Sequence, residues 1–166
     1  MLSDGSATWD DEMTSPSRTR LTGGCQCGAV RYELVEPAVR TCICHCRMCQ
    51  KASGQPFMAF ATVDQEHLQW TRGTPAVFRS SNMAQRGFCK DCGTPLTFKF
   101  EGDEIAVTIG SLDDPAAVPP TMQYGVESVI AWCATLTDLP RIRTEDDFGP
   151  EVAARFASYQ HPDSDA

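Results

Sequence analysis

The sequence predicts a mainly β domain with little helix. Five short apolar runs have the length of strands rather than helices: residues 29–35, 57–63, 96–100, 105–109 and 124–130. Glycines fall between these runs, and Gly102 with Asp103 divides the third run from the fourth, as a hairpin turn would. Because apolar residues seldom recur at helical spacing, the chain is expected to form short strands joined by turns.

Two segments are predicted to be helical. One is the short stretch 47–54, which follows a cluster of cysteines. The other is the acidic stretch 145–160, in which apolar side chains recur at helical spacing: Phe148, Val152, Phe156 and Tyr159.

The length of 166 residues suits one domain with a core of its own. We expect a flexible N-terminal tail over residues 1–20, a single domain over 21–160 and a flexible C-terminal tail over 161–166. No run approaches the roughly 18 apolar residues of a membrane span, and the first twenty residues do not resemble a secretory signal. A soluble, cytoplasmic protein is therefore expected.

The net charge of the chain indicates which classes of partner are expected. A formal net charge of −8 argues against nucleic acid, whose phosphates require a basic surface. We expect a small-molecule partner, and neither nucleic acid nor a membrane. The sequence does not indicate the oligomeric state.

Eight of the nine cysteines lie in three clusters, and this pattern favours metal binding. In a reducing compartment thiols do not pair into lasting disulfides, so metal binding or catalysis is the better explanation. The clusters are C25-Q-C27, C42-I-C44-H-C46-R-M-C49 and C89-K-D-C92. The ninth cysteine, Cys133, stands in an apolar stretch and is expected to be buried.

Two of these clusters predict a closed zinc site. Zinc takes four ligands at the corners of a tetrahedron, and two short loops with two thiolates each supply them readily. Cys89 and Cys92 form one such loop, and Cys25 with Cys27 offers the second pair. A metal at this site would join the first strand to the middle of the chain and contribute directly to folding.

The central cluster predicts a second zinc ion. Cys44, Cys46 and Cys49 supply three ligands and leave one position open, as in catalytic zinc sites. Cys42 could instead close this site, and a redox-active dithiol is a further alternative. His45 lies between two of the ligands, where it is expected to shape the site rather than bind the metal.

Four segments together resemble a known family. GGCQCGAVRYE, CHCRMCQKASG, RGFCKDCGTPLTF and IGSLDDP, in this order and spacing, resemble the glutathione-dependent formaldehyde-activating enzymes, a family that includes centromere-protein-V-like proteins. The match spans about residues 22–140 and includes Trp132 and Leu139-Pro140. The resemblance implies layered antiparallel sheets, a structural zinc on the four paired cysteines, and a catalytic zinc on Cys44, Cys46 and Cys49.

The resemblance also implies an activity. Members join formaldehyde to glutathione to give S-hydroxymethylglutathione, and are classed as carbon–sulfur lyases in the reverse sense. This chain departs from the pattern in two places: Gln123 stands where members commonly have histidine, and Cys42 is an additional thiol.

Zinc chemistry suits such a reaction, because the metal stabilises a thiolate that can attack an aldehyde carbon. Glutathione or a related thiol would be the fourth ligand. Ser53 and His45 are candidates for the proton donor, and four cations near the cysteines are candidates for holding carboxylates or neutralising sulfur: Arg47, Lys51, Arg86 and Lys90. The competing hypotheses are a protein-binding module with two structural zinc ions and a thiol-redox or metal-buffering protein.

Overall fold

The computed structural model describes residues 20–164 and shows two β-sheets with few helices. The strands are β1 (Leu21–Gly24), β2 (Arg31–Leu34), β3 (Arg40–Cys44), β4 (Met58–Asp64), β5 (Leu68–Arg72), β6 (Ala76–Arg79), β7 (Gln85–Phe88), β8 (Pro95–Lys99), β9 (Glu104–Thr108) and β10 (Met122–Tyr124). The helices are α1 (Arg47–Ser53) and α2 (Thr144–Ala153). Short 3-10 turns span Gln65–His67, Ile109–Ser111, Pro115–Ala117, Val126–Ser128 and Ala131–Asp138.

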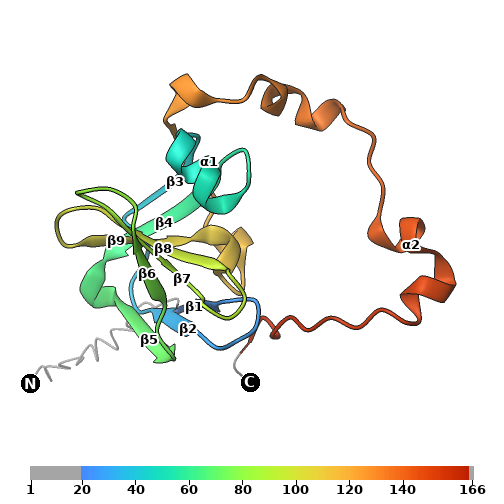
Figure 1. Cartoon of the computed structure of the whole chain (residues 1–166), viewed down its shortest axis with the longest axis horizontal. Helices are drawn as coiled ribbons and strands as arrows, with labels where there is room; N and C mark the ends of the chain where they lie inside the picture. Colours follow the sequence, from blue (N-terminus) through green and yellow to red (C-terminus); the bar gives the residue numbers. More distant parts are fainter. Residues whose placement is uncertain (1–19, 165–166) are drawn as a thin grey trace, which may run out of the picture.

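The strand order confirms the predicted fold class. One sheet has the order β1-β2-β5, and the other has the order β10-β3-β4-β9-β8-β7-β6. Neighbouring strands are antiparallel except β10, which runs parallel to β3. The predicted hairpin around Gly102 is present as the β8–β9 pair. In Figure 1, α1 and β3 lie at one end of the body, and β1, β2 and β5 lie at the other.

Strand β4 contributes to two hydrophobic clusters because its side chains alternate between the faces of the sheet. Ala61 and Val63 join the main cluster, together with residues of the smaller sheet. Met58 and Phe60, on the other face, join a smaller cluster that contains cysteines of the central group. Burial on both faces explains why residues 57–63 read as a continuous apolar run.

The loop after β9 holds the smaller sheet against the larger one. Asp113 accepts two hydrogen bonds from the buried guanidinium of Arg31, at 2.8 and 2.6 Å, and one from Thr22 Oγ1 at 2.5 Å. Tyr32, which is fully buried, places its hydroxyl 2.8 Å from Ser111 Oγ. The IGSLDDP segment therefore acts as a structural brace between the two sheets.

Two predicted elements are wrong in extent. The strand expected over 124–130 ends at Tyr124, because Gly125 has φ +68° and a 3-10 turn follows it. The helix expected over 145–160 ends at Ala153 and is broken within its length. Gly149 there has φ +66° and Pro150 follows, so the helical hydrogen bonds are interrupted.

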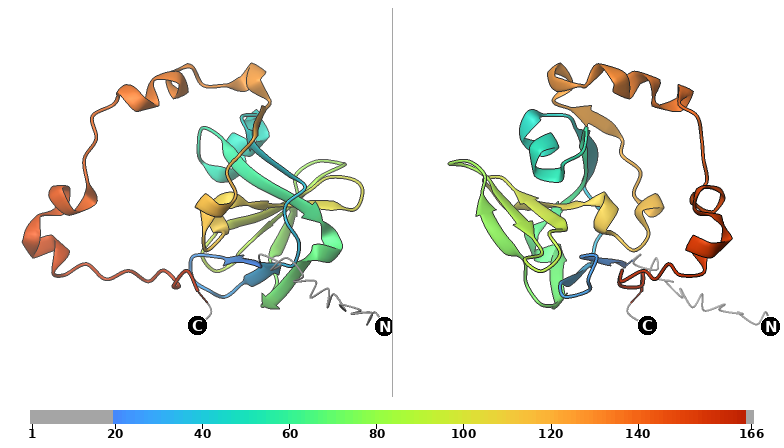
Figure 2. Two further views of the ribbon diagram at one scale, coloured as in Figure 1. Left: turned by 180° about the vertical axis from the view of Figure 1, so that it is seen from behind. Right: turned by 45° about the vertical axis from the view of Figure 1, so that its right-hand side comes forward.

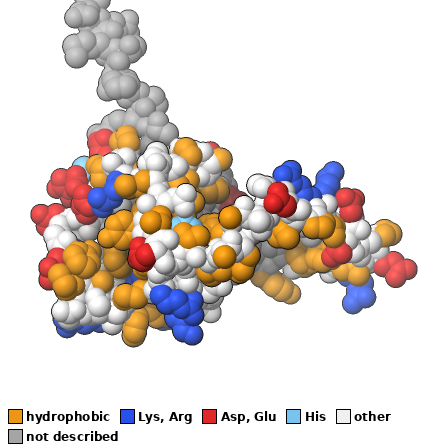
Figure 3. Space-filling view, turned by 90° about the horizontal axis from the view of Figure 1, so that it is seen from above, with side chains coloured by type: hydrophobic (Ala, Val, Ile, Leu, Met, Phe, Trp, Pro, Cys, Tyr) orange, Lys and Arg blue, Asp and Glu red, His pale blue; other side chains and the backbone are white. Residues whose placement is uncertain are grey.

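Residues 129–160 form a C-terminal arm that arcs away from the sheets (Figures 1 and 2). Many of its large apolar side chains are exposed, including Trp132 and Phe156, and Figure 3 shows such side chains along the protruding arm. Cys133 is only partly buried, so the expectation of a buried cysteine is wrong; its 3-10 turn lies away from both sheets.

The expected domain limits at 21–160 stay a prediction, and the expected tail over 1–20 lies almost wholly outside the described residues. At the other end of the arm, the amide of His161 donates to the carbonyl of Gln26 at 2.7 Å. No helix within residues 20–164 is both long enough and apolar enough to cross a membrane.

The brace gives a stability prediction. Asp113→Asn should lower the free energy of unfolding by about 3 kcal/mol, because it removes the negative charge that accepts two hydrogen bonds from the buried guanidinium of Arg31. Burial acts to raise the pKa of Asp113, but hydrogen bonds from Arg31 and Thr22 outweigh it and leave the pKa below its ordinary value of 3.8. The ionised Asp113 therefore contributes its full stabilisation at pH values above the pKa that its carboxyl group has in the unfolded chain. This contribution is lost as the pH falls through the lower pKa of the folded state.

Urea unfolding at a series of pH values should show a constant difference between wild type and Asp113→Asn near neutrality and a smaller one in acid. Asp114→Asn is the matched control. Asp114 only accepts a hydrogen bond from the Ala116 amide at an exposed turn, so its variant should change stability by less than about 0.5 kcal/mol. Equal effects of the two substitutions would contradict the proposed brace.

Candidate metal centres and active site

The first cysteine cluster forms where two turns from distant parts of the chain meet. Cys25 and Cys27 follow the end of β1, and Cys89 and Cys92 lie in the turn between β7 and β8. Gly93 has φ +78° and donates its amide to the carbonyl of Cys89 at 2.9 Å, which tightens this second turn. Both pairs therefore point their sulfur atoms into one space.

The spacing of these sulfur atoms fits a tetrathiolate zinc site. The four Sγ atoms all lie within 4.8 Å of one another. Cys25 Sγ is 3.5 Å from Cys27 Sγ, which is 3.8 Å from Cys89 Sγ. A tetrahedron with zinc–sulfur bonds near 2.3 Å has edges of about 3.8 Å. The cluster is consistent with a zinc site, as the sequence predicts.

Thiols of this cluster differ in pKa, and hydrogen bonds favour the thiolate at Cys92. Burial acts to raise the pKa of Cys92, but the Thr94 hydroxyl, 3.1 Å from its Sγ, and nearby backbone amides lower the pKa to about 6. The Val30 amide donates to Cys25 Sγ at 3.2 Å. For Cys27 the Ala29 amide lowers the pKa, yet hydrogen bonds shared with the neighbouring thiols raise it to about 12. Crowded sulfur atoms thus resist carrying several charges without a cation.

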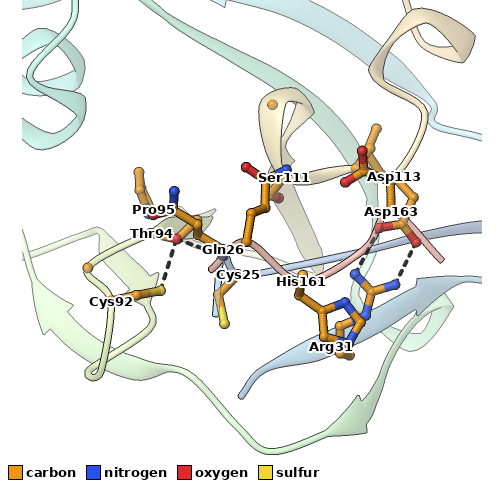
Figure 4. Close-up of a pocket in the computed structure, with 15 residues that line it drawn as sticks. Cys25, Gln26, Arg31, Cys92, Thr94, Pro95, Ser111, Asp113, His161 and Asp163 are labelled. Atoms are coloured by element: carbon orange, nitrogen blue, oxygen red, sulfur yellow. Dashed lines mark hydrogen bonds and ion pairs between the residues drawn. The ribbon is translucent and has the colours of Figure 1, made fainter. Parts of the chain in front are cut away.

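A cavity of about 390 Å³ lies beside the four-cysteine cluster (Figure 4). Cys92 and Thr94 line one side, and the Arg31–Asp113 pair lines another. His161, at the end of the C-terminal arm, also borders this cavity. The cluster is thus built into the same region as the brace that joins the two sheets.

The second cluster forms at the junction of a strand and a helix. Cys44 is the last residue of β3, Cys46 caps the N-terminus of α1, and Cys49 lies in its first turn. The Cys49 amide donates to Cys46 Sγ at 3.4 Å. The three sulfur atoms lie within 4.8 Å of one another, so they could hold one metal ion together. Cys44 and Cys49 are buried and Cys46 is partly exposed.

The surroundings give the three thiols different pKa values. Burial raises the pKa of Cys44. Burial also raises the pKa of Cys49, against the opposing effect of Arg86, whose Nη2 donates to Cys49 Sγ at 3.3 Å. For Cys46 burial acts in the same direction, but the Cys49 amide and neighbouring thiols outweigh it and lower the pKa. The helix N-terminus therefore favours thiolate at the most exposed of the three.

Cys42 lies outside the three-sulfur group. It precedes Cys44 by two residues on β3 and packs against the same small cluster, but it does not share the mutual 4.8 Å separation of the other three. Among the described residues the central group therefore brings three sulfur atoms together, not four. This geometry favours an open fourth position over closure by Cys42.

Gly125 and Gln50 hold the second cluster in place, and sequence reasoning missed both. A Cβ atom on Gly125 would lie 2.8 Å from the Cys46 amide nitrogen, so only glycine allows this approach. Gln50, buried on α1, donates through Nε2 to the carbonyls of His45 and Ser128 at 2.7 and 2.8 Å. The glycine within the apolar run 124–130 was the available signal, but its contact with Cys46 is long-range.

The two proposed proton donors have different surroundings. Ser53 Oγ donates to the carbonyl of Cys49 at 2.9 Å, in the last turn of α1. His45 is buried, and its Nε2 lies 3.0 Å from Oε1 of Gln123. His45 Nδ1 is buried and has no hydrogen-bond partner among the described residues. The geometry thus disfavours Ser53 as a free donor.

A second cavity, of about 510 Å³, adjoins the three-cysteine cluster. Its lining is mostly apolar and comes from α1 and the β6–β8 side of the larger sheet: Met48, Lys51, Ala52, Met58, Phe78, Ser80, Arg86, Gly87, Phe88, Gly93, Pro95 and Thr97. Met58 and Arg86 belong both to this lining and to the surroundings of Cys49. The cavity has the volume of a small-molecule site.

Comparisons with known proteins agree with these features. An uncharacterised lyase of Schizosaccharomyces pombe is 32% identical over 78 residues, which cover 47% of this chain and 56% of the relative. The chain thus spans less than two thirds of the length of this curated relative. A crystal structure of a Rhodobacter sphaeroides protein superposes with a TM-score of 0.50 at 22% identity, over 61% of this chain and 98% of that one, and shows similarity of fold.

The family profile matches residues 20–128, which include both cysteine clusters and end before the C-terminal arm. This match covers well over half of the chain. The chain belongs to the family of glutathione-dependent formaldehyde-activating enzymes.

Proposed function

We propose that this protein is a zinc-dependent enzyme of the carbon–sulfur lyase type. Its substrate would be an adduct between a thiol, glutathione or a close relative, and formaldehyde or another small electrophile. The observation that carries the proposal is the three-sulfur group at Cys44, Cys46 and Cys49, which leaves Cys42 outside. Family membership and the name of the lyase relative support the same class of reaction.

The two clusters would divide the work. Cys25, Cys27, Cys89 and Cys92 would hold a structural zinc, because four ligands from two turns leave no position for a substrate. Cys44, Cys46 and Cys49 would hold the catalytic zinc. A zinc ion bound by three protein ligands favours the thiolate form of a thiol at its fourth position.

The proposed reaction makes or breaks one carbon–sulfur bond and moves one proton. In the direction of synthesis, the thiol sulfur forms a bond to the aldehyde carbon, the carbonyl becomes a hydroxyl, and the thiol proton ends on that oxygen. In the lyase direction the carbon–sulfur bond breaks and the proton returns. The cavity of about 510 Å³, which Arg86 connects to Cys49, would supply space for the thiol, and Lys51 and Arg86 in its lining would supply positive charge for an anionic substrate.

Cysteine substitutions should separate the two sites. Cys25→Ser and Cys92→Ser should give insoluble protein, because a structural zinc contributes about 10 kcal/mol or more, comparable to the whole stability of a domain. Cys46→Ser should stay folded, bind one zinc ion per chain and lose activity. For the three variants, solubility and circular dichroism report folding, and zinc content reports the number of bound ions. Equal damage from all of them would contradict the division between the sites.

Gly125→Ala should disturb the second site alone. The added methyl group would meet the backbone of Cys46, and the positive φ costs alanine about 1 kcal/mol. Zinc content should fall from two ions per chain towards one while the sheets stay folded. Gly110→Ala is the control, since a Cβ there meets nothing within 4 Å. Two retained zinc ions in Gly125→Ala would show that this contact does not position Cys46.

Cobalt substitution tests the function directly. The protein should take up two Co²⁺ ions, and glutathione should alter the absorption of only one, while S-methylglutathione, which has no thiol, should alter neither. Exchange of ¹³C-formaldehyde into S-hydroxymethylglutathione should be faster with wild type than with Cys46→Ser. Two tetrathiolate spectra that glutathione leaves unchanged would refute the enzyme proposal, and Cys42→Ser would then show whether Cys42 closes the second site.

A further inference from the structure

Arg86 on β7 is a buried cation beside the three-cysteine cluster. It is only 8% exposed, and its Nη2 lies 3.3 Å from Cys49 Sγ. Its Nη1 lies 3.9 Å from Met58 Sδ, and its Cζ lies 4.8 Å from the centre of the Phe98 ring. Within residues 20–164, no aspartate or glutamate forms an ion pair with Arg86.

A buried guanidinium needs an anion close by. Removing such a charge from water without a partner costs several kcal/mol. Cys49 Sγ is at contact distance, and as a metal ligand it would be a thiolate, with the Sγ atoms of Cys44 and Cys46 within 4.8 Å of it. The ring of Phe98 and the sulfur of Met58 add weaker attraction, but neither of them carries a charge.

We infer that Arg86 is the counter-cation of the three-cysteine site and that it allows a fourth, anionic thiolate to join this site. The inference rests on the proposed function. Three thiolates around one Zn²⁺ leave one net negative charge, which repels an incoming thiolate at short range. A fixed positive charge at Cys49 cancels that excess. Arg86 is thus a positioning residue that acts through Cys49.

The other cations near the cysteines do not make this contact. Arg47 Nη1 donates to Oε1 of Gln50 at 3.0 Å, and the exposed Lys90 pairs with Asp91 at 2.8 Å. Lys51 is exposed at the second cavity. Among the four candidates that the sequence offers, the structure therefore selects Arg86.

Among the described residues, the four-cysteine cluster has no buried cation that donates to one of its sulfur atoms; Lys90, which feels the charge of Cys89 and Cys27, is exposed and pairs with Asp91. The sulfur atoms of this cluster receive hydrogen bonds from neutral groups, namely the Val30 amide and the Thr94 hydroxyl. A closed structural site never has to accept another anion, so it does not need this compensation. The difference between the two clusters is the one expected if only the central site takes up a thiolate from solution.

The position of Arg86 also connects the central site to the second cavity. Arg86 lines that cavity and reaches Cys49 at the same time. Phe98 on β8 and Met58 on β4 pack against its guanidinium, which fixes the charge before any ligand arrives. Arginine suits this place better than lysine, because its planar head stacks on a ring while it donates to sulfur.

The test compares Arg86→Gln and Arg86→Lys with wild type in Co²⁺ titrations and glutathione titrations. Arg86→Gln should lower the affinity for the second Co²⁺ ion by roughly tenfold or more and leave the affinity for the first unchanged, as expected for loss of a residue that supports a metal ligand. The glutathione concentration that half-saturates the spectral change should rise by a similar factor. Arg86→Lys, which keeps the charge, should retain most of both properties.

Arg79→Gln is the matched control, since it removes an exposed arginine from the neighbouring strand β6, whose guanidinium donates to the carbonyls of Ser81 and Asn82. It should bind both ions and glutathione as wild type does. Unchanged second-ion affinity in Arg86→Gln would overturn the inference. If that variant does not fold, Arg86→Lys decides: retained affinity for the second ion supports the charge-based role, and its selective loss overturns it.

Failure of this inference can be distinguished from failure of the proposed function. If glutathione does not change the wild-type spectrum, the proposed function and the thiolate part of the inference both fail. The role of Arg86 as counter-cation is still decided by the second-ion affinities of the two variants. If glutathione binds wild type and Arg86→Gln equally, only the inference fails.

Discussion

The convergence of two cysteine pairs is the constraint on which the rest of the structure depends. One pair follows β1 in the smaller sheet, and the other lies between β7 and β8 in the larger one, so the cluster joins the two sheets directly. The four sulfur atoms crowd within 4.8 Å of one another. A metal ion at this cluster would relieve the crowding and contribute to the free energy of folding. The Arg31–Asp113 brace fixes the same junction by hydrogen bonds and charge, which explains why the IGSLDDP segment accompanies the cysteines.

The two clusters differ because their backbones differ. Two glycine-containing turns offer four thiols to one point, which closes the first site. A strand that runs into a helix brings three thiols together. Cys42 lies two residues before Cys44 on the same strand, and its sulfur atom is outside the group of three. The helix N-terminus lowers the pKa of Cys46, and Arg86 supplies a positive charge at Cys49. These differences make the central cluster suitable for binding a substrate thiol and the other cluster suitable for holding the fold together.

Prediction from the sequence succeeded where the signal is local and failed where a distant contact decides. The β8–β9 hairpin and helix α1 are present as predicted, because turn residues and short-range spacing specify them. The strand expected over 124–130 stops at Gly125, whose conformation is set by close approach to Cys46. The helix expected over 145–160 was assigned from apolar spacing alone, and Gly149 with Pro150 interrupts it. Five strands were not predicted individually, because their sequences lack a long continuous or alternating pattern of apolar residues: β1, β3, β5, β6 and β7.

The sequence by itself determined which cysteines are candidate metal ligands, because short spacings such as those of Cys25 with Cys27 and Cys89 with Cys92 are typical of zinc sites. It also determined the fold class, through short apolar runs and their glycine punctuation. Only the tertiary structure decided which groups meet across the chain. It separated Cys42 from the central three, selected Arg86 among four possible cations, and turned IGSLDDP into a brace. These choices depend on how two sheets pack, and residues such as Arg86 and Cys49 come into contact only when strands from different hairpins lie side by side.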